Sequence, residues 1–123
     1  MKPADIDFRA FAQSVGTIVH HHAGNEIYRE GDEADFMYVI LGGSVALEAR
    51  GREVGALGPN EAMGITSLID KLPRPNTARA KLDCELVMID ADKFRFMMEE
   101  VPNFVWFVMT QMTRRLRALN EAI

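Results

Sequence analysis

The feature that most constrains the fold is a run of short segments between Thr17 and Leu57 that are rich in β-forming residues and cut by glycine. They read TIVHHH, NEIYREG, DFMYVILGG, SVALEARG and REVGALG. In SVALEARG, the side chains of Val45, Leu47 and Ala49 alternate with their neighbours, which is the period of a strand. Gly and Asp supply the backbone angles that turns need. Many short strands joined by turns predict an antiparallel barrel or jelly roll.

Helical spacing is found at the two ends of the chain and once in its middle. Apolar residues of segment 4–15 predict a short N-terminal helix, and 64–71 reads as a single short helix. Segment 76–90 returns to strand, with Thr77, Arg79 and Lys81 on one face and Ala78, Ala80 and Leu82 on the other. ADKFRFMMEEV predicts another helix, and Pro102 begins a longer one.

We therefore expect one mainly β domain with flanking helices. The N-terminal helix lies within residues 1–16, the β-roll spans 17–90, and helices fill 91–123.

The last helix carries two apolar faces. Its seam positions are spaced four, three, four, three and four residues apart, which is the a/d pattern of a coiled coil. These positions are Val105, Met109, Met112, Leu116, Leu119 and Ile123. Phe104, Phe107 and Val108 form the second face. We expect the second face to dock on the roll and the seam to form a homodimer. The alternative is that both faces cover one core.

Composition narrows the class of protein. The 123 residues carry a formal net charge of −4, which argues against general nucleic-acid affinity. No apolar run reaches the roughly 20 residues of a membrane span, and the opening residues lack a signal-peptide core. The single cysteine, Cys84, allows no intrachain disulfide and is expected to be an ordinary strand residue. We expect a cytoplasmic protein that binds neither membrane nor nucleic acid directly.

The segment EAMGITSLIDKLPRPNTARAK, residues 61–81, places a lone arginine between two prolines just after a short helix. An arginine can form charge-assisted, bidentate hydrogen bonds with an anion. Pro73 and Pro75 restrict the loop and so help to pre-organise Arg74. The segment therefore suggests an anion site. The alternative is that Arg74 is a surface arginine paired with a nearby carboxylate.

Two blocks of sequence resemble the cyclic nucleotide-binding domain family, which includes the catabolite activator protein and the regulatory subunits of protein kinases. The first is EIYREGDEADFMYVILGGSVAL, which is similar to the strands and the E-G-D turn of that family. The second pairs MGITSL with PRPNT, where the phosphate-binding cassette of the family typically reads F-G-E-L-A-L and P-R-A-A-T. The spacing from Gly64 to Arg74 matches the kinase-type cassette without a gap.

The resemblance implies a double-stranded β-helix, or jelly roll, that binds cyclic AMP or cyclic GMP at a cassette over residues 63–77. A helix N-terminus and Gly64 would approach the phosphate closely, and Arg74 would pair with it. The ligand-binding positions that it implies are Met63, Gly64, Ile65, Thr66, Ser67, Arg74, Pro75, Asn76 and Thr77.

Several positions depart from the family pattern. Ile65 replaces the glutamate that accepts a hydrogen bond from the ribose 2′-hydroxyl, Asn60 replaces a usual glycine, and Pro75 and Asn76 replace alanines. A buried hydroxyl without a partner costs about 1–3 kcal/mol, or roughly five- to 150-fold in affinity. The sequence thus keeps the phosphate anchor and loses the ribose anchor.

Three functions stay open. The chain is a regulatory sensor whose last helix acts as a lid and signals to an unknown effector protein, a degenerate domain that serves as a dimerisation or protein-interaction module, or a pocket retuned for another small anion. In the sensor, one residue among Arg114, Arg115 and Arg117, or a neighbour on the last helix, is expected to cap the base of the nucleotide. The alternative is that these arginines form a solvated helix face.

No catalytic constellation is found, and we expect no enzyme. His20, His21 and His22 are expected to be exposed strand residues and not metal ligands. No helix-turn-helix follows the last helix, so direct DNA binding is not expected.

Overall fold

Short strands joined by turns dominate the described chain, as the sequence predicts. The computed structural model describes residues 7–121. Within that range the strands are β1 (Thr17–His21), β2 (Glu26–Tyr28), β3 (Phe36–Gly42), β4 (Val45–Ala49), β5 (Arg52–Leu57), β6 (Ala62–Met63), β7 (Thr77–Ala80) and β8 (Cys84–Asp90). The helices are α1 (Arg9–Val15), α2 (Ile65–Asp70), α3 (Ala91–Glu100) and α4 (Pro102–Glu121).

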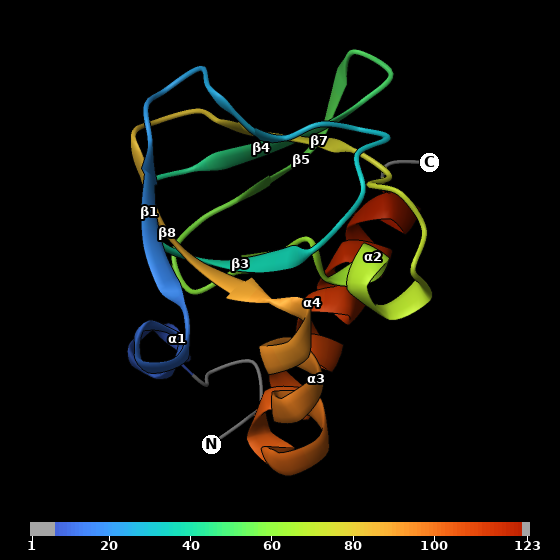
Figure 1. Ribbon diagram of the computed structural model, residues 1–123. Coiled ribbons are helices and arrows are strands. Elements are labelled where there is room, and N and C mark those ends of the chain that lie inside the picture. The colour runs from blue at the N-terminus through green and yellow to red at the C-terminus, as the bar shows by residue number, and fades with distance from the viewer. Residues whose placement is uncertain (1–6, 122–123) are drawn as a thin grey trace.

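The strands form two antiparallel sheets that pack face to face. The first sheet has the order β1-β8-β3-β6 and the second the order β2-β7-β4-β5, with four strands in each. In Figure 1 the second sheet lies above the first, α3 lies below the first, and α2 and α4 lie at one side of the roll. The predicted jelly roll, mainly β with flanking helices, is confirmed.

The space between the sheets is filled by one apolar cluster. Ile40 and Leu86 enter it from the first sheet, and Val45 and Ala78 enter it from the second. Each of these side chains is 0% exposed. Burial of such side chains stabilises the fold by roughly 1.5–3 kcal/mol for each large apolar residue.

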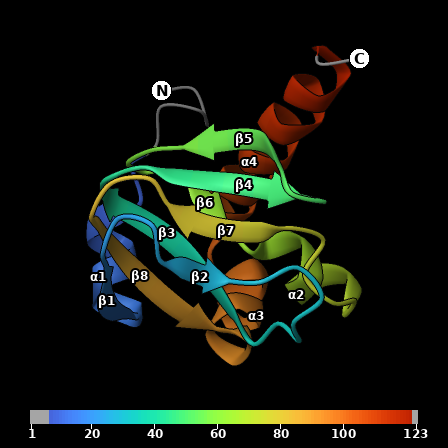
Figure 2. The same cartoon turned by 90° about the horizontal axis from the view of Figure 1, so that it is seen from above.

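A second apolar cluster lies where the helices cover the first sheet. Phe104, Phe107 and Val108 of α4 join it, each 2% exposed, together with Phe94 of α3 and Phe8 before α1. The rings of Phe8 and Phe107 have centroids 4.6 Å apart. The predicted docking face of the last helix is therefore confirmed. In Figure 2, the later turns of α4 extend beyond the roll on the side of β5.

The predicted seam lies mainly on the outward side of α4. Met109, Leu116 and Leu119 are 51%, 60% and 49% exposed. Val105 and Met112 are half-buried, and Met112 packs against the cluster beneath the first sheet. Dimerisation through this seam stays a prediction. None of the helices in the described range has the length and hydropathy of a membrane span.

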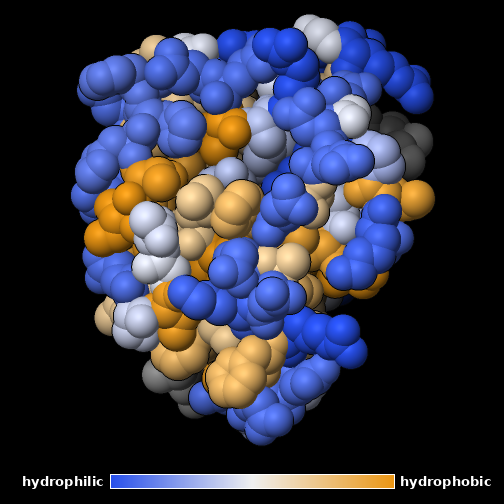
Figure 3. Space-filling model, in the orientation of Figure 1, coloured by the Kyte–Doolittle hydropathy of each residue, from blue (hydrophilic) through white to orange (hydrophobic). Residues whose placement is uncertain are grey.

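The surface away from the seam mixes polar residues with separate apolar patches. Figure 3 shows one such patch at the lower end of the molecule, where Figure 1 draws α3. Phe96 of α3 is 61% exposed.

The segment 76–90 differs from the prediction of one continuous strand. It forms β7 and β8, which belong to different sheets, and residues 81–83 bend between them. The backbone N–H groups of Lys81 and Leu82 both donate to the carbonyl of Ser44, which holds this bend against the start of β4. Leu82 follows the end of β7 and is 60% exposed, whereas Ala78 and Ala80 are buried, so the prediction that the three share one strand face is wrong for Leu82.

Other boundaries differ in smaller ways. The two-residue strand β6 was not expected, because a strand so short carries no alternation. The N-terminal helix begins at Arg9, and residues 4–6 of its predicted span lie outside the described residues, as does seam position Ile123.

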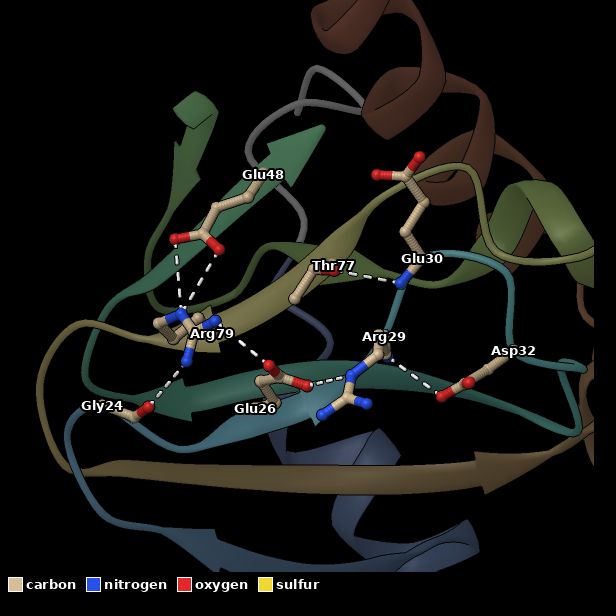
Figure 4. A network of polar contacts seen from close by, with 8 residues as sticks. All are labelled: Gly24, Glu26, Arg29, Glu30, Asp32, Glu48, Thr77 and Arg79. Carbon is tan, nitrogen blue, oxygen red and sulfur yellow. Dashed lines mark hydrogen bonds and ion pairs between the residues drawn. The ribbon is translucent and has the colours of Figure 1, made fainter. Parts of the chain in front are cut away.

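A polar network ties β2, β4 and β7 together on the outer face of the second sheet (Figure 4). The guanidinium of Arg79 donates to the carboxylates of Glu48 and Glu26 and to the carbonyl of Gly24. Arg29 donates to the other oxygen of Glu26 at 2.8 Å. Exposed ion pairs contribute little individually, but together these contacts hold the edge strand β2 in place. The turn after β2 hydrogen-bonds through Gly31 and Asp32 to the backbone of Arg74.

Candidate functional site

A cavity lies where the segment after β6, the loop before β7 and the middle of α4 meet. It has about 460 Å³ of empty space including its mouth, of which about 60 Å³ admits the centre of a water molecule. A nucleotide would therefore have to displace parts of the wall or extend through the mouth.

The structure brings most of the predicted binding positions to this cavity. Those that line it are Met63, Gly64, Ile65, Thr66, Ser67, Arg74, Pro75 and Asn76. Thr77 is not among the lining residues. Its hydroxyl accepts a hydrogen bond of 3.0 Å from the backbone N–H of Glu30, so it joins β7 to the turn after β2 (Figure 4).

Glycine is required at position 64 by the close approach of Arg74. Gly64 has φ 81°, a left-handed conformation that side chains disfavour. A Cβ atom there would lie 2.7 Å from Nη1 of Arg74 and 3.2 Å from the carbonyl oxygen of Phe36. The glycine that precedes α2 thus lets the guanidinium lie directly against the backbone.

Arg74 is buried, with 4% of its surface exposed. Its Nη1 donates to the carbonyl of Gly64 at 2.8 Å, and its Nη2 donates to the carbonyl of Phe36. Its guanidinium carbon lies 4.1 Å from the centroid of the Tyr28 ring, a cation–π contact. These three contacts hold the charged group in one place at the floor of the cavity.

The charge of Arg74 is not compensated by the described part of the chain. No carboxylate in residues 7–121 forms an ion pair with it, and its Nε is a buried atom without a hydrogen-bond partner. The alternative of a surface arginine paired with a carboxylate is therefore wrong. A guanidinium has five N–H donors, and two are used here. Buried charges are normally paired, so this arrangement fits a site for an anion.

Tyr28 lines the cavity, and its ring lies against the guanidinium of Arg74. Its ring stacks on that of Tyr38, with centroids 6.0 Å apart. Burial raises the pKa of Tyr28 to about 12, although the nearby charges of Arg74 and Arg115 act to lower it. The phenol is therefore neutral at physiological pH.

Two of the departures from the family pattern have a structural explanation. Ile65 is 3% exposed and belongs to the apolar cluster beneath the first sheet while also lining the cavity. It offers no hydrogen-bond acceptor. Asn60 has φ 66°, a left-handed conformation that asparagine tolerates, and its Oδ1 accepts a hydrogen bond of 2.9 Å from the backbone N–H of Phe8. Asn60 thus supports the same turn as glycine and also fixes the start of α1.

The helix α4 closes one side of the cavity through Gln111, Met112 and Arg115. Gln111 is 5% exposed, and its Oε1 accepts a hydrogen bond of 3.1 Å from the backbone N–H of Ala62. The sequence predicted a role for one of Arg114, Arg115 and Arg117 at the site, but it gave no prediction for Gln111. A polar residue between Val108 and Met112, on the docking side of the helix, was the signal that could have found it.

The other flagged residues lie away from the cavity. His20 and His22 are exposed beside Glu85 and Asp83, at 2.9 Å and 3.9 Å. Among residues 7–121, no group of three or more His, Cys, Asp or Glu residues is placed to hold a metal ion. Cys84 is 3% exposed, and burial raises the pKa of its thiol, which confirms its expected place in the core.

Comparison with known proteins gives a match to one family model. The model for the cyclic nucleotide-binding domain matches residues 18–101. The cAMP-dependent protein kinase regulatory subunit of Eremothecium gossypii is 39% identical over 72 residues, which cover 58% of this chain and 16% of the relative. The CRP-like cAMP-activated global transcriptional regulator of Mycobacterium tuberculosis is 29% identical over 80% of this chain and 46% of the relative.

A third relative belongs to a different kind of protein. The lysophospholipase nte1 of Aspergillus fumigatus is 33% identical over 84% of this chain but only 7% of the relative. The chain thus spans 7% to 46% of the length of these relatives.

Solved structures show the same fold. The catabolite activator protein of Thermus thermophilus superposes with a TM-score of 0.78 and 26% identity, over 92% of this chain and 55% of that one. A structure described as Sp-2Cl-cAMPS bound to PKAR CBD2 gives a TM-score of 0.77 with 19% identity, over 98% and 82% of the two chains.

Proposed function

This chain belongs to the cyclic nucleotide-binding domain family, and we propose that it is a regulatory sensor that binds cyclic AMP or cyclic GMP through Arg74. The observation that carries the proposal is the buried guanidinium of Arg74, held against the cavity wall with no carboxylate partner in the described chain. A cyclic phosphate would supply the missing charge. Charge-assisted hydrogen bonds of this kind contribute about 1.5–3 kcal/mol each.

The ribose would be held less well than the phosphate. Ile65 offers no acceptor to a sugar hydroxyl, and Thr66, Ser67 and Asn76 are the uncharged polar residues of the cassette that line the cavity. We therefore expect an affinity that depends mainly on Arg74. The chain itself supports signalling and not catalysis, because the family to which it belongs is regulatory.

Transmission of the signal would run through α4. Gln111 and Arg115 line the same cavity as the cassette, and a nucleotide would have to displace part of the cavity wall or extend through its mouth. Binding would therefore shift α4 relative to β6, where Gln111 accepts its hydrogen bond from Ala62. The exposed seam on the other side of that helix would carry the change to a second copy of the chain or to an effector.

A second candidate function is a module for dimerisation that binds no cyclic nucleotide. The observations that favour it are the small cavity, the apolar side chain of Ile65 in its wall and the exposure of Met109, Leu116 and Leu119 on α4. In that case the seam would act constitutively, and Arg74 would serve only to join its loop to Gly64 and Phe36.

Calorimetric titration of nucleotide-free protein with cyclic AMP and cyclic GMP separates the two functions. The sensor predicts saturable binding that Arg74→Ala abolishes. Arg79→Ala is the matched control, because it removes an arginine of the second sheet whose partners lie outside the cavity. No heat with either nucleotide at millimolar concentration would favour the dimerisation module. Equal binding by Arg74→Ala would refute the role given to Arg74.

A further inference from the structure

The cavity wall carries a second arginine in addition to Arg74. Arg115 of α4 lines the same cavity, and no Asp or Glu is among the lining residues. No carboxylate in the described chain forms an ion pair with Arg115. Two positive charges therefore meet in one cavity of a protein whose formal net charge is −4.

The guanidinium of Arg115 has room beside β5 because position 55 of that strand is a glycine. The guanidinium lies over Gly55, where an added Cβ would be 2.4 Å from Nη1 and 2.9 Å from Nη2. Any larger residue at position 55 would push the guanidinium away. The missing side chain of Gly55 thus leaves space for the guanidinium of Arg115. Gly55 lies within β5, where no turn requires glycine.

The two guanidinium groups act on the same side chain at the floor of the cavity. Arg74 stacks on the ring of Tyr28, and the charges of both arginines lower the pKa of that phenol against the effect of burial. Tyr28, Arg74 and Arg115 line the same cavity, so a ligand in that cavity lies among both charges.

Charge balance then narrows the class of ligand. A cyclic mononucleotide carries one negative charge and can compensate only one of the two arginines. Leaving the second charge uncompensated in a partly desolvated site is unfavourable, whereas a second anionic group would pair with it. We propose that the cavity prefers a phosphorylated ligand that bears two anionic groups, with one group at Arg74 and the other at Arg115. This inference rests on the proposed function, because it takes Arg74 as the anchor of the phosphate.

The test compares an adenine nucleotide that has one anionic group with an adenine nucleotide that has two. Cyclic AMP and adenosine 3′,5′-bisphosphate would be titrated calorimetrically into the intact chain at one ionic strength. A charge-assisted contact supplied by the second group predicts that the bisphosphate binds about ten- to 150-fold more tightly. Arg115→Ala should remove most of that ratio, because it removes the contact to the second group.

Two further variants keep the test independent of folding defects. Gly55→Ala leaves every charge in place but displaces the guanidinium of Arg115, so it should lower the ratio in the same direction. Arg117→Ala removes one exposed charge from the same helix outside the cavity, and it should leave the ratio unchanged. Thermal melts of each variant establish that it is folded.

The outcomes separate this inference from the proposed function. Equal or tighter binding of cyclic AMP in the unmodified chain, or a ratio that survives Arg115→Ala, would overturn the preference for two anionic groups. The sensor would still stand if Arg74→Ala abolished cyclic AMP binding. If neither nucleotide binds, both ideas are refuted.

Discussion

Replacement of Ile65 by glutamate tests how the cavity treats the sugar of a nucleotide. The side chain at position 65 faces both the cavity and the apolar cluster beneath the first sheet, and it is 3% exposed. Glutamate would restore the acceptor that the family places there. A satisfied hydroxyl contributes about 1–3 kcal/mol, so cyclic AMP should bind roughly five- to 150-fold more tightly.

The same substitution should weaken the fold. It removes an apolar side chain whose burial stabilises the protein by about 1.5–3 kcal/mol and places a carboxylate at the edge of the core. Arg74 and Arg115 on the same cavity wall can offset part of that penalty. We therefore expect the free energy of unfolding to fall by about 1–3 kcal/mol while the affinity rises.

The assay is calorimetric titration with cyclic AMP and with 2′-deoxy cyclic AMP, which lacks the hydroxyl in question. Ile65→Leu serves as the control, because it keeps an apolar side chain of the same size. The gain in affinity should appear with cyclic AMP alone and in Ile65→Glu alone. An unchanged affinity for cyclic AMP, or an equal gain for the deoxy analogue, would refute the reasoning that the missing acceptor limits binding.

The remaining predictions concern α4 and the floor of the cavity. Leu116→Glu should break the proposed dimer in sedimentation experiments, because Leu116 is 60% exposed on the seam. An unchanged dimer would refute the seam assignment. Leu116 is chosen over Met112 because Met112 also packs against the core and lines the cavity. Gln111→Ala should lower the free energy of unfolding in chemical denaturation by about 1–3 kcal/mol, because it leaves a buried backbone N–H without an acceptor; no loss would show that the contact is dispensable. In Tyr38→Phe, ultraviolet titration should give the remaining phenol, Tyr28, a pKa of about 12, and an ordinary value would contradict its burial beneath Arg74.

Much of the fold could be predicted because its signals are local. Glycine-punctuated segments marked strands β1 to β5, and the two apolar faces of α4 separated a buried side from an exposed one. The division of residues 76–90 between two sheets could not be read in this way. It depends on two backbone hydrogen bonds from the bend to Ser44, which is distant in sequence.

The candidate site was predictable in its cassette and less so in its walls. The spacing from Gly64 to Arg74 is a sequence pattern, and the cavity contains both. Tyr28 carries no local signal, and Gln111 carries only that of a polar residue on the docking side of α4. Their contribution to the site arises when β2, α2 and α4 converge. Thr77 shows the opposite failure, because its hydroxyl is used by the backbone of Glu30 and not by the cavity.

The most direct test of the role of Arg74 is the nuclear magnetic resonance signal of its Nε–H group. That group is buried without an acceptor in the described chain, and Arg74→Lys would assign its signal by removing it. On titration with cyclic AMP or cyclic GMP, the account predicts a downfield proton shift of this one signal that saturates with the ligand. Saturable binding that leaves the Arg74 Nε–H signal unmoved would contradict the account.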